Sequence, residues 1–96
     1  MKMETVKVRG NKTTHQVLVY ALSTCGWCKM TKDFLRDRDI EFEYIDVDLC
    51  SVEDRARVRA DIVERGGTPN FPTLIIDDET LLTGFDERRI REALDL

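Results

Sequence analysis

The order of apolar and turn-forming segments predicts an α/β fold in which a mixed β-sheet lies between helices. A β-branched apolar run at 16–21 is followed at once by a helical pattern and then by a second strand pattern at 41–48. This strand–helix–strand order implies a right-handed crossover and a parallel pair of strands. Two later strand patterns, 73–77 and 80–83, are separated by a short polar turn, so they add antiparallel strands. We therefore expect a mixed four-stranded sheet with helices on both faces.

The N-terminal segment predicts one extra strand at the edge of this sheet. Residues 5–9 alternate with a period of two and are followed by a Gly-Asn turn signal. Lys7 and Arg9 would discourage pairing with another chain at an exposed edge. Residues 1–14 are thus expected to form an N-terminal extension that carries a short strand.

The first helix is predicted from Gly26 to about Arg38. Its apolar positions are typical of a single helical stripe that faces the core: Trp27, Met30, Phe34 and Leu35. Lys29 and Lys32 lie between these positions. We expect both on the solvated face, with a rise of the local positive potential near the cysteines as the alternative.

Two further helices are predicted after the second strand pattern. Ser51 is a suitable N-cap for the first of them, and the pair Gly66-Gly67 a suitable C-cap. The last helix is expected to begin after Asp86. The apolar stripe expected for the Ser51 helix consists of Val52, Ala56, Ala60 and Val63.

Length and composition favour one small domain over residues 1–96 with a modest core. Hydrophobic residues make up 42% of the chain, and the formal net charge is -4, which gives no reason to expect nucleic acid or an anionic membrane as a partner. No apolar run approaches the roughly 20 residues of a membrane span, and the first residues lack the apolar region of a secretion signal. We expect a cytoplasmic monomer.

The sequence Cys25-Gly26-Trp27-Cys28 falls at the junction between the buried strand and the first helix. A sulfur at a helix start meets free backbone N–H groups and the positive end of the helix dipole. Cysteines in such positions have pKa values of roughly 3.5–7.5, against about 8.5 for a free cysteine, and the thiolate is the species that attacks disulfides. Cys28 is one helical turn away and can close a disulfide with Cys25.

The chain has three cysteines, so a metal site is the main rival to redox chemistry. A structural zinc needs four ligands, and only Cys50 and His15 remain to complete the set. His15 begins the strand whose far end carries Cys25, and five or more extended residues place the two roughly 20–30 Å apart. We therefore expect no metal ligands, a surface position for His15, and for Cys50 a half-buried place before a helix cap, with a third redox thiol as the alternative.

Three segments carry a resemblance to a known family. They are Tyr20-x-x-x-x-Cys25-Gly26-Trp27-Cys28, Phe71-Pro72-Thr73, and Thr83-Gly84-Phe85-Asp86. In this order the chain resembles the thioredoxin-fold redoxins, specifically the glutaredoxin branch, from about residue 16 to its end. The resemblance implies a thioredoxin fold and a dithiol–disulfide oxidoreductase, with Cys25 as nucleophile and Cys28 as resolving thiol in a redox-active pair.

The same resemblance implies which residues bind the substrate. Pro72 matches the family's cis-proline beside the active site, and the Phe71 backbone would hydrogen-bond an extended substrate. Gly84 would let backbone approach the ligand, and Asp86 matches a residue at a helix start that holds the glutathione amino group. For Trp27, placed between the cysteines, exposure and the docking of partners are favoured, with the first anchor of the helix stripe as the alternative.

The electron donor is left open between glutathione and an upstream reductase. Leu22 stands where glutaredoxins carry a basic residue, and Thr83-Gly84 replaces their Gly-Gly pair. Thr83-Gly84-Phe85 is closer to the Ser-Gly-Phe of the redoxins that reduce ribonucleotide reductase with electrons from thioredoxin reductase. No cofactor is expected beyond glutathione as a reductant, and the alternative function is a carrier of an iron–sulfur cluster or a partner on the same fold.

Overall fold

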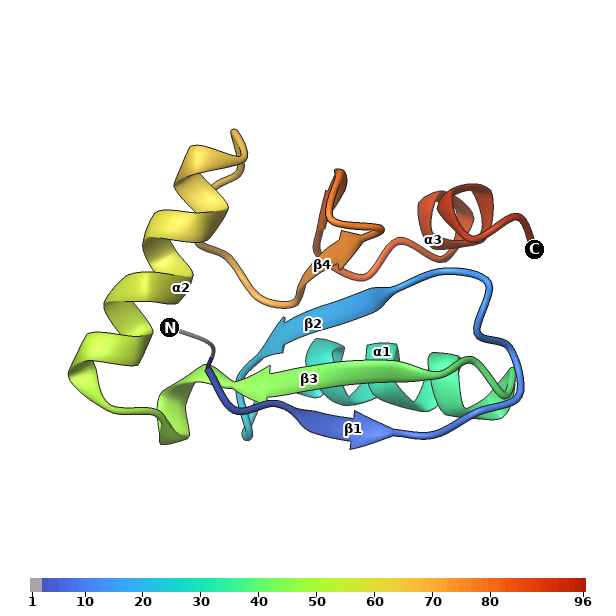
Figure 1. The fold of residues 1–96 in the computed structure, drawn as a ribbon, viewed down its shortest axis with the longest axis horizontal. Coiled ribbons are helices and arrows are strands. Elements are labelled where there is room, and N and C mark those ends of the chain that lie inside the picture. The colour runs from blue at the N-terminus through green and yellow to red at the C-terminus, as the bar shows by residue number, and fades with distance from the viewer. Residues whose placement is uncertain (1–2) are drawn as a thin grey trace.

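A computed structural model describes residues 3–96 and contains a five-stranded sheet in the order β1-β3-β2-β4-β5 (Figure 1). The central pair, β2 and β3, is parallel, and the other three neighbouring pairs are antiparallel. The predicted mixed sheet and the extra N-terminal edge strand are both confirmed. The strands are β1 (Val6–Val8), β2 (Val17–Ala21), β3 (Phe42–Asp46), β4 (Thr73–Ile76) and β5 (Thr80–Thr83).

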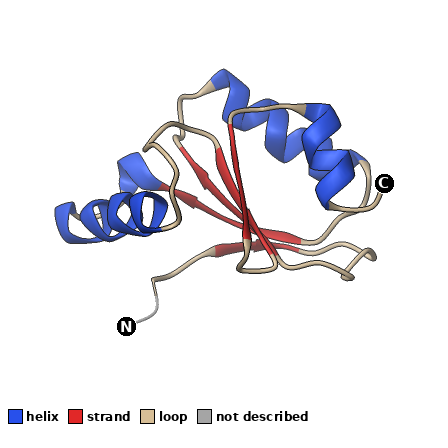
Figure 2. Cartoon of the chain, turned by 90° about the horizontal axis from the view of Figure 1, so that it is seen from above, coloured by secondary structure: helices blue, strands red, loops and turns tan. Residues whose placement is uncertain are grey.

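Helices cover both faces of the sheet, as Figure 2 shows from above. They are α1 (Gly26–Asp37), α2 (Val52–Glu64) and α3 (Glu87–Ala93), with a short 3₁₀ turn, η1 (Val47–Leu49), between β3 and α2. One buried cluster joins α1 and α3 to the odd-numbered positions of β2, such as Val19. A second joins α2 to the opposite face through Tyr20, Ile45 and Ile75. In the described part of the chain no helix is both long and apolar enough to cross a membrane.

The predicted apolar stripe of α1 is half wrong. Phe34 and Leu35 are buried, but Trp27 is 60% and Met30 49% exposed. Cys28 and Thr31 take the inward positions of the first two turns instead. A threonine can face the core here because its hydroxyl donates to the backbone carbonyl of Trp27 at 2.8 Å, so no polar atom is left unpaired.

The predicted stripe of α2 is wrong as a whole. Val52, Ala56, Ala60 and Val63 are all exposed, and the buried side chains are Val58 and Ile62. Charged residues border the buried side because they find partners there. Asp61 accepts hydrogen bonds from the Tyr20 hydroxyl at 2.6 Å and from Arg65 at 2.9 Å.

The predicted helix caps are confirmed. Ser51 Oγ accepts from the Asp54 N–H at 3.1 Å, and the Asp86 carboxylate accepts from the Arg89 N–H at 3.2 Å. Gly66 follows α2 with a φ of 87°, a left-handed conformation that favours glycine. The Gly67 N–H then reaches the carbonyl of Ile62 at 2.9 Å, which closes the helix end.

His15 is partly buried, with 18% of its side chain exposed, where a surface position was predicted, because it links three parts of the chain. Its Nδ1 lies 2.6 Å from the Asp77 carboxylate in the turn after β4, and its Nε2 lies 3.1 Å from that of Asp95 after α3. The hydrogen bond to Asp77 raises the pKa of His15 most; burial opposes it, and the charge of Asp77 and the hydrogen bond to Asp95 add to the rise. In its doubly protonated form the ring can donate to both carboxylates.

Truncating the buried residue of α2 should destabilise the fold far more than truncating its exposed neighbour. Ile62 is fully buried, so Ile62→Ala should lower the free energy of unfolding by about 2–5 kcal/mol. Val63 is 55% exposed, so Val63→Ala should change it by about 0.5 kcal/mol or less. Urea unfolding followed by circular dichroism measures both. Equal losses would contradict the observed helix face.

The His15 bridge should stabilise the protein only in a defined pH range. A raised pKa means that its contribution is full below the pKa of the unfolded state and is lost as pH rises through the folded value. The pKa of Asp77 is lowered by the same hydrogen bond, so that contribution is lost as pH falls through its lowered value. His15→Gln should therefore lower the melting temperature most near about pH 5.5 and least near about pH 9.

Asp95→Asn, which removes one carboxylate and keeps the other, should show the same pH trend with a smaller loss. If His15→Gln lowered the melting temperature equally at both pH values, the imidazolium charge would contribute nothing to stability.

Candidate functional site

The candidate site is built where β2 passes into α1. Cys25 is the N-cap of α1, with extended backbone angles (φ -88°, ψ 119°). Its sulfur occupies the position that a serine oxygen takes in other helices, and it accepts the backbone N–H of Cys28 at 3.2 Å. The N–H of Cys25 itself donates to the carbonyl of Leu22 at 3.2 Å. The sulfur therefore lies at the positive end of the helix, where a thiolate is stabilised.

The two cysteines of the motif differ sharply in environment. Cys25 is half-buried, whereas Cys28 is completely buried. Burial, and next the hydrogen bond with Cys25, raise the pKa of Cys28 to about 12. The Cys25 sulfur can therefore contact a substrate, while the buried Cys28 remains a thiol. This is the asymmetry that an attacking and a resolving cysteine require.

The Phe71–Pro72 peptide bond is cis, as the resemblance implied. Pro72 is buried, and its carbonyl accepts the N–H of Gly84 at 2.7 Å. Gly84 has a φ of 80°, which favours glycine. Two of the predicted site segments are thus directly bonded to each other.

Aromatic contacts join the segment that contains Gly84 and Phe85 to α1. The Trp27 ring is stacked on that of Phe85, with centroids 6.4 Å apart and planes at 23°. Phe85 in turn meets Phe34 edge to face at 5.8 Å. Trp27 is exposed, as expected, while Asp86 is exposed but uses its carboxylate to cap α3.

Asp48 is a site residue that the sequence did not predict. The backbone N–H of Ser23 donates to its carboxylate at 2.8 Å, and the Ser23 hydroxyl donates to the other carboxylate oxygen. These bonds lower the pKa of Asp48. They fix the loop before Cys25 to η1, where Leu49 is 73% exposed. The only sequence signal for this contact was Ser23, a hydroxyl residue two positions before Cys25.

Lys32 is not on the solvated face, contrary to prediction. Its side chain is only 13% exposed, because its ammonium pairs with Asp46 at 2.9 Å and lies 3.8 Å above the centre of the Tyr44 ring. Lys29, the other lysine of this segment, is 78% exposed and pairs with Asp33. The sequence signal that Lys32 faces inward was its spacing of four residues from Cys28, which places both residues on the same side of α1.

Cys50 is half-buried before the α2 cap, as predicted, with its sulfur 3.6 Å from the carbonyl of Asp46. Burial, followed by the charge of Asp54, raises its pKa. Within residues 3–96 no three His, Cys, Asp or Glu side chains group into a metal site. His15 contributes to the bridge described above and not to the cysteine site.

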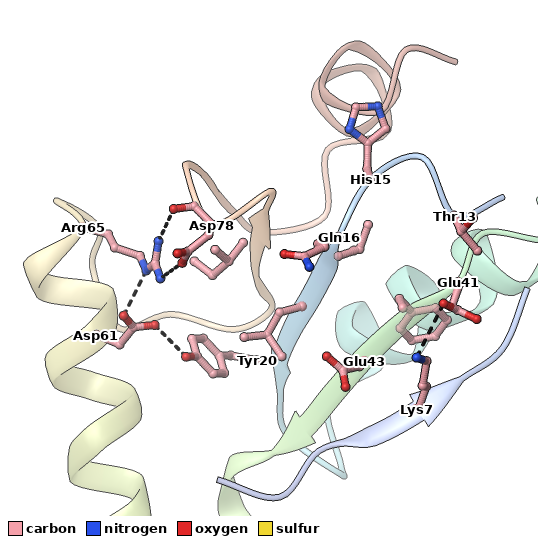
Figure 3. A pocket seen from close by; sticks show the side chains of 14 residues that line it. Lys7, Thr13, His15, Gln16, Tyr20, Glu41, Glu43, Asp61, Arg65 and Asp78 are labelled. Atoms are coloured by element: carbon pink, nitrogen blue, oxygen red, sulfur yellow. Dashed lines mark hydrogen bonds and ion pairs between the residues drawn. The ribbon is translucent and has the colours of Figure 1, made fainter. Parts of the chain in front are cut away.

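A separate groove of about 580 Å³ lies over the sheet on the side of α2 (Figure 3). None of the three cysteines lines it. Tyr20 points toward this side, where its hydroxyl binds Asp61, and Arg65 connects Asp61 to Asp78 (Figure 3). The tyrosine of the first motif segment therefore anchors α2 in the core and does not face Cys25.

Comparisons with known proteins agree with this geometry. The family model for glutaredoxin matches residues 17–81. A glutaredoxin-like 8.6 kDa protein in the rubredoxin operon of Clostridium pasteurianum is 28% identical over 82% of this chain and 97% of its own length. The crystal structure of the glutaredoxin from Methanosarcina mazei Go1 is similar with a TM-score of 0.87 and 36% identity, over 99% of this chain and 91% of that one. Methanosarcina acetivorans methanoredoxin has a TM-score of 0.80 and 38% identity, over 91% and 90% of the two chains.

The difference in burial predicts an order of alkylation in the reduced protein. Iodoacetamide should modify Cys25 first, and Cys28 at least about tenfold more slowly, since its thiol is buried and its pKa is raised. Cys50, half-buried and also with a raised pKa, should react more slowly than Cys25. Peptide mass spectrometry over a time course measures all three. Modification of Cys28 as fast as Cys25 would contradict the proposed asymmetry.

Proposed function

Because the chain belongs to the glutaredoxin family, we propose that it is an enzyme that reduces disulfide bonds in proteins through Cys25 and Cys28. The family supports thiol–disulfide redox chemistry in general. The observation that carries the specific proposal is the pairing of an accessible sulfur at the start of α1 with a buried one directly behind it. That arrangement suits two successive exchange steps at a single substrate disulfide.

In the first step the Cys25 thiolate attacks one sulfur of the substrate disulfide. A mixed disulfide forms between Cys25 and that sulfur, and the other substrate sulfur leaves as a thiolate. The N–H of Cys28 and the helix dipole stabilise the attacking charge. In the second step Cys28 attacks Cys25, so that the substrate is released reduced and the Cys25–Cys28 disulfide remains. Two electrons pass from the cysteine pair to the substrate.

The binding surface in this proposal surrounds Cys25. Phe71 precedes the cis-proline, and its N–H and C=O form no hydrogen bond with the described residues, so both are free to pair with an extended substrate. The exposed ring of Trp27 offers an apolar contact. Gly84 lies beside Pro72 through its hydrogen bond, and Asp86 presents an exposed carboxylate at the same end.

We propose that an upstream reductase, not glutathione, supplies the electrons. Leu22 is an apolar residue where a basic side chain would hold a glutathione carboxylate, and Thr83 replaces the first glycine of the family's Gly-Gly pair. We further propose that the substrate is a protein such as ribonucleotide reductase. The proposal also includes a cytoplasmic location, a monomeric state and no bound cofactor.

The test is to offer the oxidised protein two donors and to follow its free thiols. Thioredoxin reductase with NADPH should reduce the Cys25–Cys28 disulfide quickly, and glutathione with its reductase should do so at least about tenfold more slowly, since an unpaired carboxylate costs binding energy. Faster reduction by glutathione would overturn the choice of donor. A coloured protein after anaerobic purification, with the colour lost in Cys25→Ser, would favour an iron–sulfur carrier instead.

Variants of the three cysteines test the roles of the thiols. Cys25→Ser should lower the reduction of a protein disulfide by more than about a hundredfold, because it removes the attacking thiolate. Cys28→Ser should accumulate the mixed disulfide, which intact mass spectrometry detects. Cys50→Ser is the matched control and should retain activity within about twofold. Full activity in Cys25→Ser would refute the mechanism.

A further inference from the structure

The resolving step poses an electrostatic problem that the cysteine motif alone does not solve. Cys28 must attack as a thiolate, yet it is completely buried, and burial disfavours the charged form. The start of α1 is already used by the Cys25 sulfur, which accepts the nearest backbone N–H. A further positive group close to Cys28 would stabilise the thiolate as it forms.

Lys32 is placed to supply that charge. Residues four apart on a helix lie on the same side with their Cβ atoms about 5–6 Å apart, so Lys32 follows Cys28 along the buried side of α1. The lysine does not extend to solvent: 13% of its side chain is exposed. Burial raises the pKa of Cys28 most; of the two effects that lower it, the backbone hydrogen bond at Leu22 is the larger and the positive charge of Lys32 the smaller.

The sheet holds the Lys32 ammonium in this place. Tyr44 and Asp46 alternate along β3 on the face that packs against α1, and they contact the ammonium at 3.8 Å (ring centre) and 2.9 Å. Asp46 is paired in register with Ala21, the last residue of β2 before the Cys25 loop. The ion pair therefore lies at the end of β2 and β3 from which the chain enters the Cys25 loop.

Four charged or titratable groups lie on the elements that meet at this end of the sheet. They are Cys25 at the helix start, Lys32 on α1, Asp46 on β3, and Asp48 on η1, which is bonded to Ser23. Lys32 is the one cation among them. Lys29 is closer in sequence, but it is directed to solvent and pairs with Asp33.

We propose that Lys32 is a positioning residue for the resolving step, with its ammonium held by Asp46 and Tyr44 so that it stabilises the thiolate of Cys28. The proposal rests on the function proposed above. In the step it assists, the Cys28 thiol loses its proton and its sulfur attacks Cys25. The bond between Cys25 and the substrate sulfur breaks as the Cys25–Cys28 bond forms, and the released substrate thiolate takes up one proton.

Rapid mixing with dithiobis(nitrobenzoate) separates the two exchange steps, and the Cys50→Ser background removes the third thiol. Attack by Cys25 releases the first coloured thiolate in a phase whose rate depends on reagent concentration. Attack by Cys28 on the mixed disulfide releases the second in a phase that does not. The rate of this second phase, measured across pH, reports on the Cys28 thiolate.

Lys32→Met should slow the second phase about tenfold at neutral pH and move its pH profile upward by about one unit or more, as expected when an opposite charge is removed. The first phase should stay within about twofold. Lys32→Arg keeps the charge and should retain most of the wild-type second phase. Lys29→Met, the exposed control on the same helix, should change neither phase.

Lys32→Met leaves the partly buried Asp46 without its partner. The double variant Lys32→Met/Asp46→Asn removes both charges, and circular dichroism checks that both variants are folded. The double variant should show the same slow second phase. A second phase with the wild-type rate and pH profile in either variant would overturn the role of Lys32. A first phase missing from the wild-type protein would instead overturn the proposed function, so the two failures are distinguishable.

Discussion

The hydrogen bond from the Cys28 N–H to the Cys25 sulfur is the contact on which the rest of the site depends. It exists because α1 begins at Gly26 and Cys25 is its N-cap, so that the sulfur caps the first turn. A cap shifted by one residue would move the sulfur away from the free N–H groups of α1. The same start directs Cys28 into the core, since it lies on the inward side of the first turn. One helix boundary thus determines both which cysteine is accessible and which is buried.

Long-range bonds hold that boundary in place. The loop between β2 and α1 is short, and Ser23 fixes it to Asp48, which lies 25 residues further along the chain. On the other side, the Gly84 N–H binds the carbonyl of Pro72 and joins the β5–α3 connection to the loop that enters β4. The stacked rings of Trp27 and Phe85 add a third link. Loops without regular structure are mobile unless tied, so these bonds preorganise the site.

The sequence predicted the sheet, the order of elements and the caps, because these follow from local patterns of apolar, capping and turn residues. It failed where a polar side chain faces inward and finds a partner far away in the chain. Val52, Ala56, Ala60 and Val63 matched a helical period, yet Val58 and Ile62 are buried, since Asp61 and Arg65 beside them are satisfied by Tyr20 and Asp78. Lys32 was placed in solvent for the same reason: its partner Asp46 lies on another element. Partners of this kind become visible only once the strands are in register.

The inward polar residues of α1 also distinguish two uses of a buried polar group. Thr31 satisfies its hydroxyl within its own helix, through the carbonyl of Trp27, and needs nothing from the sheet. Lys32 cannot do so, because an ammonium has three donors and a full charge, and its burial costs free energy unless a carboxylate lies close by. A methionine at this position would fill similar space without that cost, and replacing a buried ion pair by apolar residues is often neutral or stabilising. A largely buried ion pair is therefore weak evidence for stability, and the proposed effect on the Cys28 sulfur gives a physical reason for a charge at this position.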